Sequence, residues 1–279
     1  MGLKRKHIVR VISQTLRGFT AGEMGMQAVA LSFFTTMAFV PFLAVIFAIS
    51  NKVGLGAYLK DLLYQNFGHE EILNYLLGFA ENIIATSRQG IYGVVSFIIF
   101  LWMVIWLMIC IEKAFNKIWK VGKSRVLWKR MLVYGTTMVA SPFIIIIFLS
   151  VSLTIADGLN LLGMEIPLFG SVSGILVWAA FFLFVVIVLT CIYIFVPNAK
   201  VRFMPAFSSA AVAGAAFTVI QYMYLETQVF VSRMNSIYGI FAAVPLFMVW
   251  LNIGWFIVLM GSELSHSLQS LTSCTESVK

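Results

Sequence analysis

The stretch ILVWAAFFLFVVIVLTCIYIFV, residues 175–196, decides the class of fold. It contains no Asp, Glu, Lys or Arg, and its length matches the about 20 apolar residues that a helix needs to cross a bilayer. Apolar and polar residues do not alternate along it, as they would in the strand of a membrane barrel. Because lipid offers the backbone no hydrogen-bond partner, the stretch is predicted to be a membrane-spanning helix.

Five further uncharged runs have the same character. The composition agrees with a membrane protein, since 61% of the 279 residues are hydrophobic and only 11% are charged, whereas a soluble globular chain is about 25% charged. We therefore predict an all-α polytopic integral membrane protein, with a single domain over 1–279. Its six predicted spans lie near 28–50, 91–111, 131–156, 171–196, 203–225 and 237–261.

The N-terminal residues 4–20 are predicted to form an interfacial amphipathic helix. No short apolar core with a small-residue cleavage site follows this segment, so we expect it to remain uncleaved. One face of the predicted helix carries Ile8, Ile12, Leu16 and Phe19, and the opposite face carries Arg10, Gln14 and Arg17.

Residues 56–87, between the first two spans, are predicted to form an outer helical hairpin. Apolar residues recur there at intervals of three and four, and Gly68 and His69 divide the segment in two. Two interpretations stay open: the hairpin is a cap packed on the bundle, or it is a lid or docking surface for a partner protein.

The positions of Lys and Arg predict the orientation of the chain. With six spans both termini share one side, and of the 19 cations only Lys52, Lys60, Arg88 and Arg233 fall on the other side. Because Lys and Arg are strongly biased to the cytoplasmic side of membrane proteins, both termini are predicted to be cytoplasmic.

Seven cations gather in the loop 111–130. We interpret this loop as a topology signal and a contact for anionic lipid, each cation contributing about 1 kcal/mol near the surface. Trp119 and Trp128 are expected in the interfacial aromatic belt. The loop is too short to fold an RNA-binding domain, so no nucleic acid is expected as a partner. The expected lipid contacts are Lys117, Lys120, Lys123, Arg125, Lys129 and Arg130.

Four segments resemble the YihY/BrkB family of bacterial inner-membrane proteins. They are ALSFFTTMAFVPFLAVI at 30–46, EKAFNKIWKV at 112–121, VPNAKVRFMPA at 196–206 and SIYGIFAAVPLFMVWLNIGWFIVLMGSEL at 236–264. The residues that match the family's motifs are Ala114, Asn116, Trp119, Pro197, Asn198, Tyr238, Gly239, Gly261 and Glu263.

The resemblance implies a six-helix protein of the bacterial inner (plasma) membrane. Some members of the family are labelled ribonuclease BN, and others have been linked to envelope-lipid export. The chain departs from the family at Phe207-Ser208-Ser209, where Pro-Gly is frequent. We expect a structural role for the motif residues Pro197, Asn198, Tyr238, Gly239 and Gly261.

The sequence lacks motifs for catalysis or metal binding. His7, His69 and His266 are far apart, and no zinc, Walker-type or GxSxG motif is present. The three cysteines have neither a disulfide nor a metal spacing. No catalytic residue, metal or cofactor is therefore expected, and the sequence disfavours the ribonuclease label.

Polar and helix-bending residues in or beside the spans are the candidates for function, because polar groups are costly in lipid. Thr35 and Thr36 could instead bond their own helix backbone, and Asn252 could be a packing contact. Glu112 and Glu263 close spans two and six, where each forms an ion pair with nearby cations (Lys113 and Lys117, or Arg10 and Arg17) or belongs to a polar gate. The candidates for a substrate path or gate are Thr35, Thr36, Pro41, Glu112, Asn116, Asn252 and Glu263.

Two patterns concern the shape of the bundle. Pro41 and Pro245 interrupt spans one and six, where they either kink the helices or mark a transport site. Ala206, Ala210 and Gly214 recur every four residues in span five, which predicts the close approach of another helix.

Two functions remain open from the sequence. The first is a transporter that moves or passes an amphipathic envelope lipid. The second is a non-catalytic membrane scaffold that binds a periplasmic or cytoplasmic partner through the hairpin or the basic loop, and a ribonuclease is a distant third. Membrane lipids and a membrane or periplasmic protein are the expected partners. The sequence determines neither the substrate, the direction and energy source of transport, nor the oligomeric state.

Overall fold

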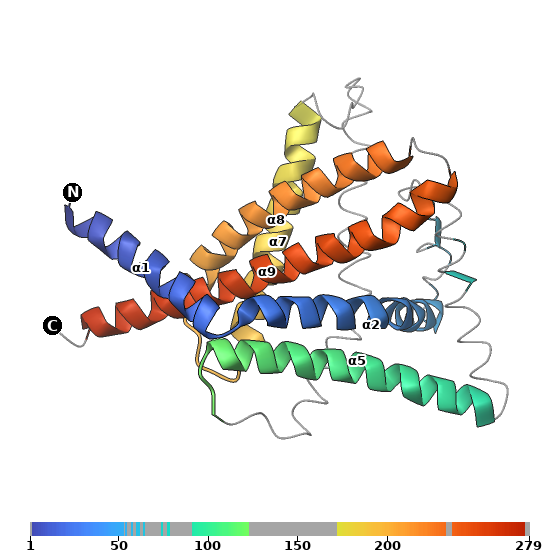
Figure 1. Cartoon of the computed structure of the whole chain (residues 1–279), viewed down its shortest axis with the longest axis horizontal. Helices are drawn as coiled ribbons and strands as arrows, with labels where there is room; N and C mark the ends of the chain where they lie inside the picture. Colours follow the sequence, from blue (N-terminus) through green and yellow to red (C-terminus); the bar gives the residue numbers. More distant parts are fainter. Residues whose placement is uncertain are drawn as a thin grey trace. The chain divides into compact units, whose positions relative to one another are not determined.

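The computed structural model describes residues 2–52, 91–122, 172–232 and 236–276, and isolated residues between 54 and 78. All regular secondary structure in this part of the chain is helical (Figure 1). The predicted span 131–156 and most of the predicted hairpin 56–87 lie outside the described residues.

The described helices cover five of the six apolar runs. Three contain stretches long and apolar enough to cross a membrane, at Trp178–Phe195, Phe203–Thr227 and Pro245–Leu271, and a shorter apolar stretch covers Met24–Ala38. The prediction of an all-helical fold is thereby confirmed. The helices are α1 (Gly2–Ala21), α2 (Met24–Lys52), α5 (Ile91–Ile118), α7 (Val172–Phe195), α8 (Phe203–Ser232) and α9 (Ser236–Glu276).

The chain divides into two compact units. The first comprises Met1–Phe33, Cys110–Ser124 and Trp178–Lys279, and the second comprises Phe34–Ile109 and Arg125–Val177. The first unit thus holds α1, α8, α9, the start of α2, the end of α5 and most of α7. In the second unit, the Tyr64 hydroxyl donates to Asn74 Oδ1, which joins the two segments of the predicted hairpin.

Small residues let α8 approach α7 and α9 closely. Ala206 and Ala210 are completely buried, and a Cβ added to Gly214 would lie 2.9 Å from Val186 Cγ2 on α7. A Cβ added to Gly261 on α9 would lie 2.7 Å from Ala213 Cβ on α8. The predicted small-residue face of this helix is therefore confirmed as a packing face.

Two helix ends in the first unit use left-handed backbone at non-glycine residues. Glu23, with φ of 53°, separates α1 from α2, and the two helices run in different directions (Figure 1). Lys120, with φ of 52°, ends α5. Its amide donates to Lys117 O, and the Val121 amide donates to Asn116 O at 2.9 Å. This pair of bonds is a Schellman motif, which satisfies carbonyls at the end of the helix.

Two helices continue well past the predicted span ends. α5 extends to Ile118 instead of 111, and α9 extends to Glu276 instead of 261. With 41 residues, α9 is about 60 Å long at 1.5 Å per residue, twice the about 30 Å of a bilayer's hydrocarbon core. The extensions carry polar residues. The apolar pattern used for the prediction therefore ends before the two helices do.

The N-terminal helix uses its apolar residues differently from the prediction. Phe19 is buried and its ring lies 4.6 Å from that of Phe256 on α9, whereas Ile12 and Leu16 are exposed. The predicted apolar residues of α1 are thus divided between a contact with α9 and the exposed surface.

Candidate functional site

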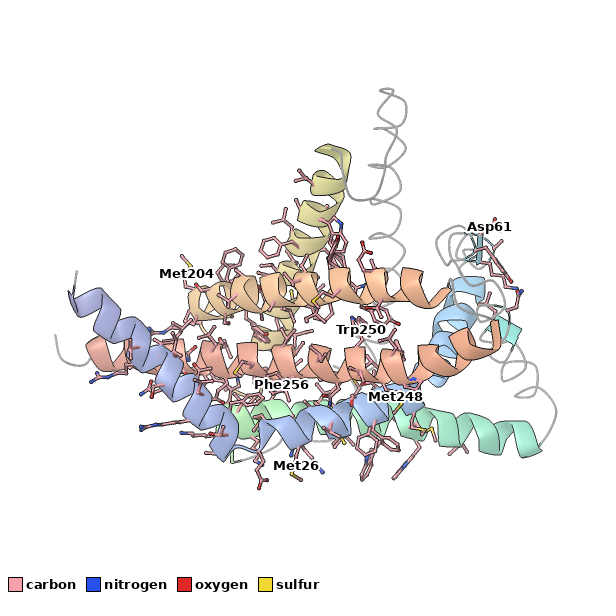
Figure 2. All side chains as sticks on the ribbon, turned by 45° about the horizontal axis from the view of Figure 1, so that its top comes forward. Met26, Asp61, Met204, Met248, Trp250 and Phe256 are labelled. Carbon is pink, nitrogen blue, oxygen red and sulfur yellow. The ribbon has the colours of Figure 1, made fainter. Side chains whose placement is uncertain are left out.

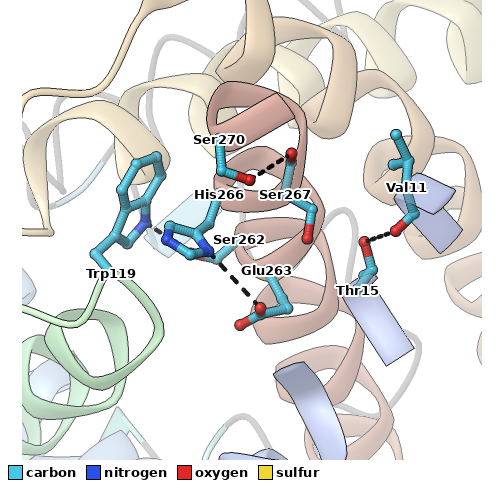
Figure 3. Close-up of polar contacts among 8 residues, drawn as sticks. All are labelled: Val11, Thr15, Trp119, Ser262, Glu263, His266, Ser267 and Ser270. Carbon is cyan, nitrogen blue, oxygen red and sulfur yellow. Dashed lines mark hydrogen bonds and ion pairs between the residues drawn. The ribbon is translucent and has the colours of Figure 1, made fainter. Parts of the chain in front are cut away.

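Polar side chains gather where the ends of α5 and α9 meet the connection between α7 and α8. All of them belong to the first unit. Figure 3 shows the part of this group that lies around α9. We call the group the polar cluster and define it as Glu112, Asn116, Trp119, Asn198, Ser262, Glu263 and His266.

The α5 side of the cluster is one helical stripe. Glu112, Asn116 and Trp119 follow at intervals of four and three, which places them on the same face of the helix. Glu112 is only 1% exposed, and its Oε1 accepts a bond of 3.4 Å from Asn116 Nδ2. The other end of the same amide, Asn116 Oδ1, accepts a bond of 2.8 Å from the Asn198 amide. Asn116 thus ties a buried carboxylate to the connection between two other helices.

Trp119 joins α5 to α9. Its Nε1 donates to Ser262 Oγ at 3.3 Å, and its ring meets the His266 ring edge to face, with 5.3 Å between centroids. The other side of His266 faces the carboxylate of the preceding turn, with 3.8 Å between His266 Nδ1 and Glu263 Oε1 (Figure 3). The α9 side of the cluster is therefore held by the aromatic contact of Trp119 with His266 and by the long contact between His266 and Glu263.

Helix α1 covers the Glu263 carboxylate. Gly18 lies so close to it that an added Cβ would stand 2.6 Å from Glu263 Cδ. The next residue of α1, Phe19, packs on Phe256. The lack of a side chain at position 18 is thus what lets α1 lie over the buried carboxylate, which is 7% exposed.

The connection between α7 and α8 is held from both sides. Gln269 Oε1 accepts a bond of 2.8 Å from the Arg202 amide, and Gln269 Nε2 donates to Lys200 O at 2.9 Å. Together with the bond from the Asn198 amide to Asn116, these contacts fix the connection to α9 and α5. The Pro-Asn motif at 197–198 therefore lies at a point where three helices are tied together.

The structure also gives a reason for the glycine at 261. The Tyr193 side chain is fully buried, and its hydroxyl donates to Val258 O at 3.1 Å. A Cβ at Gly261 would collide with the Tyr193 hydroxyl. Tyr238 and Gly239 lie at the start of α9, where the structure describes only the backbone.

Three of the seven predicted gate residues come together in the polar cluster, namely Glu112, Asn116 and Glu263. Thr35 and Thr36 are half-buried on the part of α2 that belongs to the second unit. Pro41 lies within the bounds of α2. Asn252 is half-buried on α9, eleven residues before Glu263 and so about 16 Å away along the helix axis.

Lys117 and Glu263 have ion-pair partners other than the expected ones. Lys117 pairs with Glu23, with 3.7 Å between Nζ and Oε2 at the exposed surface. The ion-pair partner of Glu263 within the described part of the chain is His266, whereas Arg10 and Arg17 are exposed. Glu263 thus faces a histidine instead of one of the two arginines.

The sequence did not predict several residues of this region. Trp119 was expected in a lipid-facing belt, but it is buried because its indole points at α9. The recurrence of polar residues at short helical intervals in 262–270 was the sequence pattern that could have indicated this region. Ser262, Ser265 and Ser267 are buried there, and Ser265 Oγ has no hydrogen-bond partner within the described part of the chain.

An aromatic group lies between α8 and α9, away from the polar cluster. The Trp250 ring, labelled in Figure 2, stacks on Tyr224 with 5.1 Å between centroids and on Phe247 with 5.7 Å. Trp250 Nε1 is buried and has no hydrogen-bond partner among the residues that the structure describes.

The predicted lipid-contact residues are described only in part. Lys117 and Lys120 are exposed at the end of α5, and Lys123, Arg125, Lys129 and Arg130 lie outside the described residues. Among the residues that the structure describes, no group of three or more His, Cys, Asp or Glu side chains is arranged to hold a metal ion.

Comparison with known sequences gives a consistent result. The sequence model of the family described as virulence factor BrkB matches residues 15–277. The chain is 29% identical over 272 residues to a UPF0761 membrane protein of Chromohalobacter salexigens, covering 92% of this chain and 63% of that protein. It is 28% identical over 257 residues to a UPF0761 membrane protein of Aeromonas salmonicida, covering 90% and 86%.

Several of the relatives are longer proteins. A UPF0761 membrane protein of a Janthinobacterium species is 29% identical over 265 residues, which cover 90% of this chain and 58% of the relative. The chain thus spans about three-fifths of the length of the first curated relatives that it matches. No solved structure matches the chain.

Proposed function

The chain belongs to the virulence factor BrkB family of membrane proteins, and from that premise we propose that it passes an amphipathic envelope lipid through the bacterial inner membrane. In this proposal both termini are cytoplasmic, and the polar cluster is a gate at the cytoplasmic end of the helices. The exposed Lys117, Lys120 and Lys200 near the cluster would gather anionic headgroups.

The burial of two carboxylates in one small region carries the proposal. Glu112 and Glu263 are both almost fully buried, and taking a carboxylate out of water costs several kcal/mol unless its partners compensate. Among their contacts, Asn116 Nδ2 lies 3.4 Å from Glu112 Oε1, and His266 Nδ1 lies 3.8 Å from Glu263 Oε1. Costly polar groups at the ends of membrane helices are more often retained for function than for stability.

A gate needs contacts that can separate, and the cluster supplies them. It is held by single hydrogen bonds between helices, such as Trp119 to Ser262 and Asn198 to Asn116. Each such bond contributes only about 1 kcal/mol net. A lipid headgroup that enters between α5 and α9 could replace these bonds with its own.

Native mass spectrometry of the gently solubilised protein tests the proposal. We expect wild type to retain a specific lipid and Glu263→Gln to lose it. Glu23→Gln is the matched control, because Glu23 is an exposed carboxylate outside the polar cluster. Retention of only bulk lipid by wild type, or equal retention by both variants, would contradict the gate.

The alternative function is a non-catalytic scaffold. The exposed cations at the end of α5 favour it, because they are placed to bind an acidic partner of the basic loop. A scaffold would tolerate Glu263→Gln and Asn116→Leu and would co-purify with a stoichiometric partner protein, which changes in the loop 111–130 or the hairpin 56–87 would release.

A further inference from the structure

Helix α1 has three different faces. The first packs on α9 through Val11, Thr15 and Phe19, which are buried. The Thr15 hydroxyl is satisfied within α1, since it donates to Val11 O at 2.9 Å (Figure 3). This face and the contact of Gly18 with Glu263 fix how α1 is rotated about its own axis.

The second face is apolar and exposed. Val9 is 60% exposed, Ile12 52% and Leu16 51%. Their intervals of three and four place the three side chains in one stripe along the helix. A water-facing helix would gain nothing from three aliphatic side chains in a row, so the stripe calls for an apolar partner.

The third face is polar and basic. Arg10, Gln14 and Arg17 are all exposed and follow one another at intervals of four and three, so they form a second stripe. At about 100° per residue, this stripe lies roughly a third of a turn from the apolar one. An apolar stripe beside a basic one is the arrangement of helices that lie in the surface of an anionic membrane.

The start of α2 places α1 at the level of the lipid headgroups. After the break at Glu23, α2 begins at Met24 and soon presents the exposed apolar side chains of Met26 and Val29. Met26 points away from the neighbouring helices (Figure 2). Because the apolar stretch of α2 starts within three residues of the end of α1, α1 cannot be far from the membrane surface.

We propose that α1 lies in the surface of an anionic lipid leaflet, with Val9, Ile12 and Leu16 against the acyl chains and Arg10 and Arg17 at the lipid phosphates. The partner is a lipid surface and not a protein, because three aliphatic side chains cover far less than the about 800 Å² that each partner buries in a stable protein interface. The two arginines match the negative charge of such a leaflet. This surface contact is independent of whether the protein transports a lipid.

A depth measurement tests the proposal. Cys110, Cys191 and Cys274 are replaced by alanine, and bimane is attached to Leu16→Cys or, as the matched control on the basic stripe, to Gln14→Cys. The labelled full chain is placed in nanodiscs of phosphatidylethanolamine and phosphatidylglycerol with brominated acyl chains. We expect about twofold stronger quenching of the label at position 16 than at position 14.

The charge dependence is tested on the same label. Replacing phosphatidylglycerol by phosphatidylcholine, or introducing R10Q and R17Q together, should lower the quenching at position 16. Slower hydrogen exchange of α1 in anionic than in zwitterionic nanodiscs should appear in the unlabelled wild type, where no substitution can disturb the fold.

Three outcomes would overturn the proposal. One is equal quenching of both labels by iodide in the water phase, which would place the apolar stripe in solvent. Another is a label at position 16 that neither brominated lipid nor iodide reaches, which would mean that a second copy or another protein covers the stripe. The third is hydrogen exchange of α1 that ignores the charge of the lipid.

Discussion

The packing face of α8 and the polar cluster are both tightly packed, but different forces hold them. The α8 face consists of Ala206, Ala210, Ala213 and Gly214, which have no polar side-chain atoms to satisfy. The polar cluster buries carboxylates, an amide and an indole, which are satisfied both within their own helix and by other segments. The α8 face should therefore be destabilised mainly by added side-chain volume. The polar cluster should fail when one partner is removed.

The largest effect is expected where side-chain volume is added to α9 opposite the packing face of α8. Gly261→Ala should lower the free energy of unfolding by about 3 kcal/mol, because the new Cβ would collide with Tyr193 and Ala213. The midpoint of thermal unfolding in detergent measures this. Gly25→Ala is the matched control, since a Cβ there meets nothing within 4 Å, and it should be neutral or slightly stabilising.

A smaller loss is expected where the polar cluster loses a partner. Asn116→Leu should cost about 2 kcal/mol, because the Asn198 amide would lose its acceptor. Asn252→Leu removes the same group from a half-buried position, where no hydrogen bond joins the side chain to another described residue. Equal losses for the two variants in thermal unfolding would show that the cluster bonds contribute nothing.

The contact between α1 and the Glu263 carboxylate combines a small residue, Gly18, with a buried polar group. Gly18→Ala should cost about 1 kcal/mol, less than at Gly261, because the Glu263 side chain can move aside. If the collision is the cause, Gly18→Ala should cost less in a Glu263→Ala background. A double-mutant cycle on the free energy of unfolding measures this coupling, and strict additivity would contradict it.

The smallest effect, of opposite sign, is expected at the end of α5. Lys120 adopts left-handed backbone, which glycine adopts without strain, so Lys120→Gly should stabilise the protein by about 0.5 kcal/mol. Lys113→Gly, in the interior of the same helix, should instead destabilise it by about 1 kcal/mol. Thermal unfolding of the two variants side by side checks the signs, and a loss at position 120 would show that the lysine side chain matters more than the backbone.

The two regions also differ in how far the sequence predicted them. The small residues of α8 recur every four positions, and this local spacing was enough to predict a packing face. Glu112, Asn116 and Glu263 were predicted as gate residues, but His266, which faces Glu263, and Trp119, which packs on His266, were not. Nothing near position 119 in the sequence indicates that its indole meets Ser262, which lies 143 residues later.

The sequence by itself determined that the protein is helical, where most of its helices begin, and which family it resembles, because apolar length and small-residue spacing are local properties of the chain. Only the tertiary structure decided that α5 and α9 continue past their apolar runs, that α1 divides its apolar residues between α9 and an exposed stripe, and which polar side chains meet. The physical reason is that a buried polar group needs a partner, and where a distant segment supplies it, as Ser262 does for Trp119, no local pattern records that partner.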